Sequence, residues 1–189
     1  MKTRMIGLLM LGLFILSASS CSILPQSLPP AVHDFGYVTS DSPSEISTSA
    51  PQSLITVAAP KWLADNRIRY RLLYATPTQV RFYSLDRWIA SPPELFEQML
   101  NNSGKQWLAP ITIKLHVFEQ QFDTANQAKV VMHFTASTIP DDNKHKANKR
   151  DFHLQFPCPT PDAKGAVTGF THLTKQAVDK IQAWLMETN

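Results

Sequence analysis

Hydrophobic and polar residues alternate most clearly from Arg67 to Tyr74. The hydrophobic side of this segment carries Ile68, Tyr70, Leu72 and Tyr74, and the other side carries Arg67, Arg69 and Arg71. A period of two in branched and aromatic residues is typical of a half-buried β-strand. The segment Ala75 to Thr78 contains Pro77 and interrupts the pattern, and a second run of β-forming residues follows from Val80 to Trp88. The two runs together predict an antiparallel hairpin.

A helix is predicted directly after this hairpin. Ser91 suits the N-cap, Pro92 suits the first helical position, and Glu94 lies three residues after the cap, as in a capping box. Hydrophobic residues then recur at helical spacing, at Leu95, Phe96, Met99 and Leu100. Gly104 is a candidate for the end of this helix.

Further strand-like segments lie on both sides of this region. They are Ser53 to Ala58, Ile111 to Phe118, Lys129 to Thr138, and the alternating Phe152, Leu154 and Phe156. In the second of these, Ile111, Ile113, Leu115 and Val117 fall on one face. Polar segments at Asp123 to Asn126 and Asp141 to Arg150 separate them and predict turns or loops.

A terminal helix is predicted from about Thr168. Its apolar stripe comprises Phe170, Leu173, Ala177, Ile181, Trp184 and Leu185. We expect this stripe to pack on the apolar face of the strand that starts at Ile111, because a short helix needs such burial to be stable. Two helices on one side of a mainly antiparallel sheet make an α+β fold.

The three arginines at 67, 69 and 71 allow two interpretations. Arginines are rarely buried without a partner, so their face of the strand either meets water or contacts an acidic partner. We favour exposure to water.

The N-terminus has the layout of a secretory signal. Lys2 and Arg4 precede an apolar run from Met5 to Leu16, and small residues then lead to Cys21. The run is short for a bilayer span. Small residues that end on a cysteine indicate a bacterial lipobox, in which the Cys21 thiol is acylated by diacylglycerol and the chain is cleaved just before this residue. The alternative is an ordinary signal in which Cys21 has no role.

This signal divides the chain into three parts. Residues 1–20 are predicted to be the signal peptide, and residues 21–52 a tether rich in Ser and Pro, with a short edge strand at Phe35 to Val38. Residues 53–189 form one domain, which is long enough to bury a core. Ser22 follows the cysteine and is not Asp, which indicates sorting to the periplasmic face of the outer membrane.

Composition removes several functional classes. The chain has 18 basic and 15 acidic residues, and loss of Lys2 and Arg4 with the signal leaves 16 basic residues, so the mature protein is nearly neutral. This balance argues against nucleic-acid binding. If Cys21 is acylated, Cys158 has no cysteine to pair with, and we interpret it as an unpaired thiol without a role.

The sequence contains no recognisable catalytic, cofactor or metal motif. The histidines do not fall at metal-ligand spacing, and His116, His133 and His153 are predicted on solvent-facing positions of strands. Neither a Gly-rich phosphate loop nor a serine-hydrolase elbow is present. Asp141 and Asp142 are interpreted as turn residues. The basic run from Lys144 to Arg150 is interpreted as a solvated loop, with contact to anionic lipid or an acidic partner as the alternative.

An ordered set of short motifs resembles a known family. The set comprises His33-Asp34-Phe35-Gly36, Pro60 with Trp62-Leu63, Tyr70-Arg71-Leu72, Arg87-Trp88, Glu94-Leu95-Phe96, Phe118 to Asp123, and Pro159 to Ala163. It is similar to the ABC-type transport auxiliary lipoprotein family, which includes paraquat-inducible protein C-like members. The resemblance extends from about His33 to Leu185. The basic loop at Lys144 to Arg150 departs from it, so partner contacts there cannot be carried over.

The resemblance implies a non-enzymatic function. Members are accessory subunits of mammalian-cell-entry (MCE) transport systems, in which an ABC permease and ATPase drive lipid movement between the two membranes. The chain would be anchored in the outer membrane through Cys21 and would bind the MCE-domain protein, without a cofactor. The resemblance leaves room for a homo-oligomer.

Two other functions compete with this one. The first is a lipoprotein that assists envelope assembly or activates a cell-wall synthase, since similar small α+β domains serve there. The second is a periplasmic enzyme, against which the lack of a catalytic motif argues.

Overall fold

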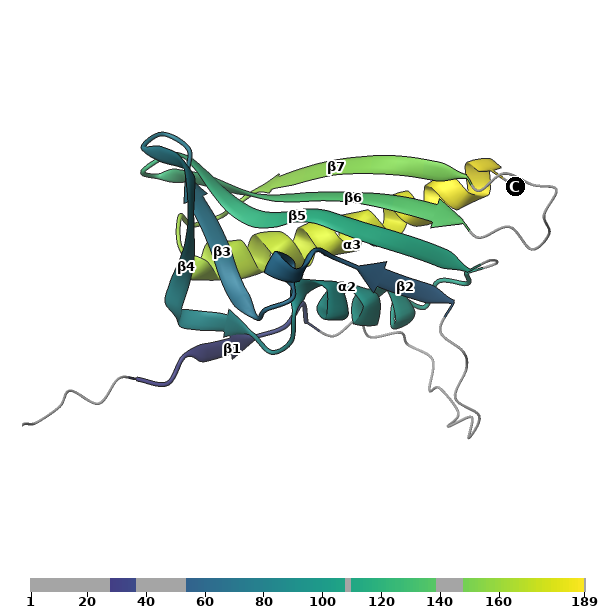
Figure 1. The fold of residues 1–189 in the computed structure, drawn as a ribbon, viewed down its shortest axis with the longest axis horizontal. Helices are drawn as coiled ribbons and strands as arrows, with labels where there is room; N and C mark the ends of the chain where they lie inside the picture. The colour runs from purple at the N-terminus through teal and green to yellow at the C-terminus, as the bar shows by residue number, and fades with distance from the viewer. Residues whose placement is uncertain (1–27, 37–53, 108–109, 139–147, 189) are drawn as a thin grey trace, which may run out of the picture.

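The computed structural model describes residues 28–36, 54–107, 110–138 and 148–188. In chain order its elements are β1 (Ala31–His33), β2 (Ile55–Ala58), the 3-10 helix η1 (Lys61–Leu63), β3 (Arg67–Leu72), β4 (Thr76–Trp88), α2 (Pro92–Asn101), β5 (Ile111–Thr124), β6 (Gln127–Thr138), β7 (Lys149–Pro157) and α3 (Ala163–Thr188). The predicted α+β class is confirmed, because these strands form one sheet that packs against two helices (Figure 1).

The sheet is mixed but mostly antiparallel. Its strand order is β1-β4-β3-β5-β6-β7, and β2 pairs with the other end of β5. The pairs β3–β4, β5–β6 and β6–β7 are antiparallel, whereas β1–β4, β2–β5 and β3–β5 are parallel. The predicted β3–β4 hairpin is confirmed, with a tighter turn than expected. Pro77 lies inside β4, and the N–H of Ala75 donates to the carbonyl oxygen of Leu72.

The edge strand near the N-terminus is present but lies earlier than predicted. It comprises Ala31 to His33, whereas the prediction placed it at Phe35 to Val38. Phe35 is only 3% exposed and belongs to the core, so a hydrophobic residue that suggested a strand is instead an anchor for the segment. The rest of the predicted tether lies largely outside the described residues.

Helix α2 begins as predicted. The N–H and the hydroxyl group of Ser91 both donate to Glu94 Oε2, at 2.9 and 2.8 Å, which fixes the first turn. All four residues of the predicted apolar stripe are buried. The helix ends at Asn101, and Gly104 adopts a positive φ of 69° in the turn that follows.

Strand β5 is longer than predicted and changes face. A register shift between Leu115 and Val117 lets Phe118 point into the core, so Val117 is not the fourth residue of the buried face. A β-bulge of this kind inserts one residue and reverses the alternation that follows. Beyond it, Gln120 and Phe122 are also buried.

Helix α3 starts at Ala163, five residues before the prediction. Asp162 Oδ1 accepts the N–H of Gly165 at 2.7 Å, which caps the first turn. The helix packs mainly over β6 and β7 (Figure 1). The predicted packing on the strand from Ile111 is found at Phe118, which stacks on Phe170, so the prediction holds only in part. The predicted stripe does face the core, with Ile181 fully buried and Leu185 partly buried.

Aromatic rings fill the space between the sheet and α3. Phe118 stacks on Phe170 with ring centroids 3.9 Å apart, and Phe134 stacks on Phe152 at 4.8 Å. Trp88 contacts the Phe170 ring edge-on at 5.7 Å. The domain core is therefore closed by direct contact between the helix and the strands.

Candidate functional site

The sequence-predicted lipidation residue, Cys21, lies outside the described residues, as do Asp141, Asp142 and the first part of the basic run. The last two residues of that run, Lys149 and Arg150, are the start of β7 and not a loop. Among the described residues, the candidate surfaces for a functional site are the exposed face of the sheet and its edges.

The face of β3 that carries the arginines differs from the prediction. Arg69 is only 4% exposed, and its guanidinium group donates to the carbonyl oxygen of Trp62 and, at 2.9 Å, to Asp65 Oδ2. Arg71 Nε donates to both carboxylate oxygens of Glu119 at 2.9 Å. Partners within the chain therefore hold both of these arginines, which explains how this face tolerates charge without full exposure.

The third arginine, Arg67, stays exposed at the edge of this network. Its guanidinium carbon lies 3.7 Å from the centroid of the Phe82 ring, and its Nη2 donates to Asp65 Oδ2 at 2.7 Å. Asp65 thus joins Arg67 and Arg69. The Coulomb attraction and hydrogen bonds of the two arginines outweigh burial and lower the pKa of the Asp65 carboxyl group.

Three histidines form a row across the exposed face of β5, β6 and β7. His133 lies directly opposite His153 in the antiparallel register, and their rings stack with centroids 3.7 Å apart. The register shift at Leu115 to Val117 places His116 beside His133, at 5.0 Å. We call His116, His133 and His153 the histidine row.

The histidine row is held by a hydrogen-bond chain at one end. Thr135 Oγ1 donates to Asp151 Oδ1, and because a hydroxyl group has one proton, His116 Nε2 must donate to Thr135 Oγ1, 2.9 Å away. The hydrogen bond from Thr135 lowers the pKa of Asp151. This chain fixes the tautomer of His116.

The electrostatics of the row favour the neutral form of His133. Burial lowers the pKa of His133, and repulsion from His153 and His116 lowers it further, against a smaller opposing effect of Asp151. The rings of His133 and His153 are stacked, with planes 26° apart, whereas the planes of His116 and His133 are tilted by 46°. In the described ranges, no group of three or more His, Cys, Asp or Glu residues is placed to hold a metal ion.

The solvent-facing positions of the three histidines are those that the sequence predicts. Their adjacency is not predicted, because the pattern within one strand contains no information on its register with the next. The sequence indicates only that each histidine occupies a polar position of a strand. The order of the strands in the sheet brings the three residues together.

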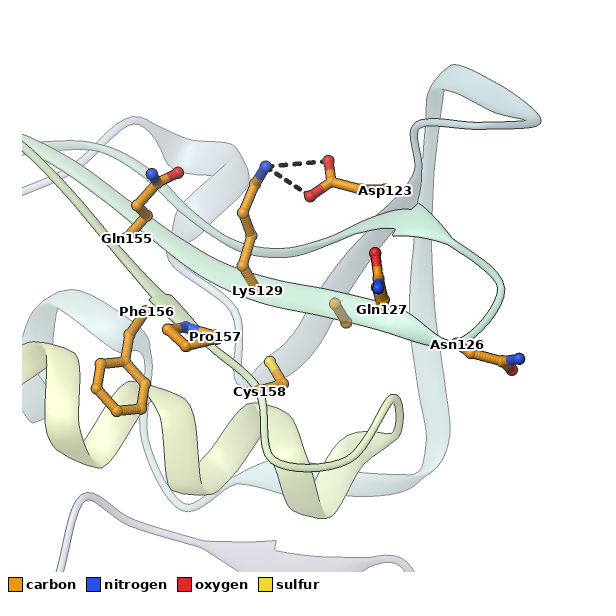
Figure 2. A pocket seen from close by; sticks show the side chains of 9 residues that line it. Asp123, Asn126, Gln127, Lys129, Gln155, Phe156, Pro157 and Cys158 are labelled. Atoms are coloured by element: carbon orange, nitrogen blue, oxygen red, sulfur yellow. Dashed lines mark hydrogen bonds and ion pairs between the residues drawn. The ribbon is translucent and has the colours of Figure 1, made fainter.

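A hollow of about 520 Å³ lies where the β5–β6 turn meets the end of β7 (Figure 2). Figure 2 shows the ion pair between Lys129 Nζ and the Asp123 carboxylate, with distances of 2.7 and 2.9 Å, on one side of it. Cys158 and Phe156 lie on the other side. The hollow is open and mixed in polarity.

The Cys158 thiol in this hollow is poorly suited to nucleophilic chemistry. Burial raises its pKa, and this effect exceeds the opposing one of the Gln120 side-chain amide, which donates to Sγ at 3.4 Å. A raised pKa keeps the thiol protonated at neutral pH, whereas the thiolate is the reactive form.

None of the helices that the structure describes combines the length and the apolar character needed to cross a bilayer.

Comparisons with known proteins give a match in structure only. No family model matches the sequence, and no characterised protein matches it. The fold is similar to the crystal structure of protein XCC0632 from Xanthomonas campestris, assigned to family DUF330, with a TM-score of 0.61 and 16% identity over 71% of this chain and 82% of that one. A crystal structure of an uncharacterized protein is also similar, with a TM-score of 0.56 and 13% identity over 84% of this chain and 99% of that one. The chain thus shares the fold of a DUF330 protein.

Proposed function

We propose that this chain is a non-enzymatic outer-membrane lipoprotein and an accessory subunit of an MCE-type ABC transport system. The observation that carries the proposal is the similarity in fold to a DUF330 protein, since DUF330 is the family of ABC-transport auxiliary lipoproteins. The lipobox layout that ends on Cys21 supports it independently, because it comes from a part of the chain that the fold comparison does not use.

In this function the chain contributes an anchor and a folded domain. Cys21 would carry the acyl chains, and Ser22 would direct the protein to the outer membrane. The domain would bind the MCE-domain protein and hold its far end at that membrane. The permease and the ATPase would supply the energy at the inner membrane.

The core of the domain favours a binding role over lipid carriage. Stacked rings, among them Phe118 on Phe170 and Phe134 on Phe152, occupy the space between the sheet and α3. An acyl chain would have to displace these contacts, and filled cores of this kind are rigid on average. We infer that the lipid cargo passes through the MCE-domain protein.

Co-purification tests the proposal. The acylated chain would be cross-linked in cells, extracted in detergent and purified, and its partners identified by mass spectrometry. We expect an MCE-domain protein among the partners, and less of it with Cys21→Ser, which removes the anchor and leaves the folded domain unaltered. Recovery of a cell-wall synthase or an assembly factor without an MCE-domain protein would favour the competing lipoprotein function. An enzymatic activity of the purified chain on envelope substrates would contradict both.

A further inference from the structure

Four exposed hydrophobic side chains gather around β1 and the end of β4. They are Leu28, Val32, Leu85 and Ile89, with exposed fractions of 75%, 49%, 55% and 65%. We call these four residues the apolar edge. Exposed hydrophobic residues that occur singly need no explanation, but a group on one edge indicates a contact surface.

The strand register places Val32, Leu85 and Ile89 together, and Leu28 lies three residues before β1 in the chain. In the parallel β1–β4 pair, Val32 lies opposite Arg87. Leu85 and Ile89 are two positions on either side of Arg87 and share its side of β4, whereas the intervening Trp88 is buried. The N–H of Ile89 donates to the carbonyl oxygen of His33 at 2.8 Å, which extends the pairing to the end of the edge.

The surface continues onto α3. Val32 and Ile89 border a shallow hollow of about 370 Å³ together with Val167 of that helix. The charges near this hollow are few. Asp34 is exposed, and the Asp86 carboxylate is held by His33 Nε2 at 2.8 Å. Arg87 is exposed and lies between Leu85 and Ile89 in the sequence.

The proposed function makes Cys21 the lipidation residue, and the next step rests on it. The short length of chain between Cys21 and the apolar edge indicates what covers this edge. Leu28 lies seven positions after Cys21. Seven residues span at most about 25 Å in any conformation, at roughly 3.3–3.6 Å per residue. The apolar edge therefore begins within that distance of the acylated cysteine.

The edge cannot swing away from the domain while it remains folded. Strand β1 is hydrogen-bonded to β4, and Phe35, two residues after β1, is 3% exposed in the core. A short connection to the membrane at one end and a fixed attachment to the domain at the other bring this side of the molecule to the bilayer.

We propose that the apolar edge rests on the phospholipid surface. Hydrophobic side chains gain free energy at the boundary between headgroups and acyl chains, and an arginine among them can meet the headgroup phosphates. Figure 1 shows that β1 lies at the opposite end of the domain from the C-terminal end of α3. Contact at the apolar edge would therefore direct that far end into the periplasm.

Depth-dependent quenching tests this orientation. The acylated full-length chain, with Cys158→Ser, would carry a single cysteine at Ile89→Cys or at the control position Met186→Cys. Ile89 and Met186 are similarly exposed, at 65% and 69%, and Met186 lies near the C-terminal end of α3. Each cysteine would bear an environment-sensitive dye, in vesicles of phosphatidylethanolamine and phosphatidylglycerol that contain spin-labelled lipid.

We expect the dye at position 89 to be quenched several-fold more strongly than the dye at position 186. Adding Leu85→Glu to the Ile89→Cys chain should remove most of that difference, while circular dichroism remains unchanged. Equal quenching at the two positions in protein that floats with the vesicles would overturn this inference alone. Protein that carries no acyl group and does not float would overturn the proposed anchor as well. The dye at position 89 could instead become more shielded from water as protein density rises, without being quenched by the spin-labelled lipid. That result would show that a second copy of the chain covers the edge, and it would overturn the inference.

Discussion

The ring of Phe35 meets the ring of Trp88 edge-on, with centroids 5.2 Å apart and planes at 75°. The two residues are 53 positions apart in the chain, and both are almost fully buried. Phe118 contacts the pair from β5, with its ring centroid 5.7 Å from that of Phe35. Phe35 thereby attaches the segment around β1 to the centre of the domain, in addition to the pairing of β1 with β4.

Replacement of Phe35 tests this attachment. We expect Phe35→Ala to lower the free energy of unfolding by about 3–5 kcal/mol, because a buried ring is lost and a cavity remains. Val32→Ala, at a half-exposed position of the same segment, should change it by less than about 0.5 kcal/mol. Urea denaturation of the mature, non-acylated chain measures both. Equal small effects would mean that the segment is not part of the cooperative core.

The apolar stripe of α3 gives a second prediction. Ile181 is fully buried, so Ile181→Ala should cost about 2–5 kcal/mol, a large part of the stability of a domain of this size. Lys180 is exposed beside it, and Lys180→Ala should cost less than about 0.5 kcal/mol. Urea denaturation again gives the comparison. An unchanged midpoint for Ile181→Ala would contradict the packing of α3 on β6 and β7.

The ion pair between Arg71 and Glu119 gives a third prediction. The Glu119 side chain is 8% exposed, so Arg71→Met leaves a carboxylate buried without its partner. The expected loss is near the lower end of about 3–5 kcal/mol, since the Arg71 side chain is itself 25% exposed. The double change Arg71→Met with Glu119→Leu should recover much of this loss, which a double-mutant cycle by denaturation would measure. A double variant less stable than Arg71→Met would show that packing, and not the charge, dominates at this site.

The histidine row makes stability depend on pH. The folded pKa of His133 lies below its ordinary value of 6.5, so the unfolded chain binds more protons than the folded one between these two values. The free energy of unfolding should therefore fall as the pH is lowered through 6.5, towards the lower pKa of the folded state. His133→Gln should reduce this slope, as measured by denaturation at several pH values.

The matched control for this experiment is His172→Gln. His172 is exposed on α3 and stacks on Phe156, away from the row. A wild-type slope in the His133 variant, or an equal reduction in the His172 control, would contradict an origin in the row.

The anchor gives the last prediction. Cys21→Ser should abolish incorporation of radioactive fatty acid and leave uncleaved precursor, because the proposed function makes this thiol the site of acylation. Labelling of cells that express each form, followed by gel analysis, measures both effects. Equal label in the two forms would show that the lipid is attached elsewhere or that no lipobox is present. Cys158→Ser, which removes the other cysteine, should label like the natural chain.

The elements that the sequence predicts best are those whose type and position follow from the pattern of residues within the element itself. The strand at Arg67, the cap at Ser91 and the stripe around Ile181 each reflect local geometry, and each is found in the structure. The arginine face could not be predicted, because Glu119 comes from another strand and no property of β3 reveals it.

The start of α3 shows how tertiary contact can override local preference. Gly165 and Gly169 are poor helix formers, yet both lie inside the helix. A Cβ atom at Gly165 would overlap the backbone carbonyl group of Thr160, and one at Gly169 would lie 2.9 Å from Val130 Cγ2. The glycines allow close approach of the helix to the rest of the fold, which the sequence alone does not disclose. The histidine row is hidden for a similar reason, since it depends on register between strands.

The free edge of β2 has a consequence for copies crowded on one surface. The N–H of Val57 donates to Glu97 Oε2 of α2 at 2.7 Å, so this donor is not available to a strand from another molecule. At the other end of the sheet, β7 begins with the exposed charged residues Lys149 and Arg150. A lipid anchor would confine copies of the protein to the membrane surface, where their local concentration is high. At high concentration, exposed strand edges favour aggregation through pairing between molecules. Blocked and charged edges of this kind oppose such aggregation, which leaves neighbouring molecules free to meet through their side chains.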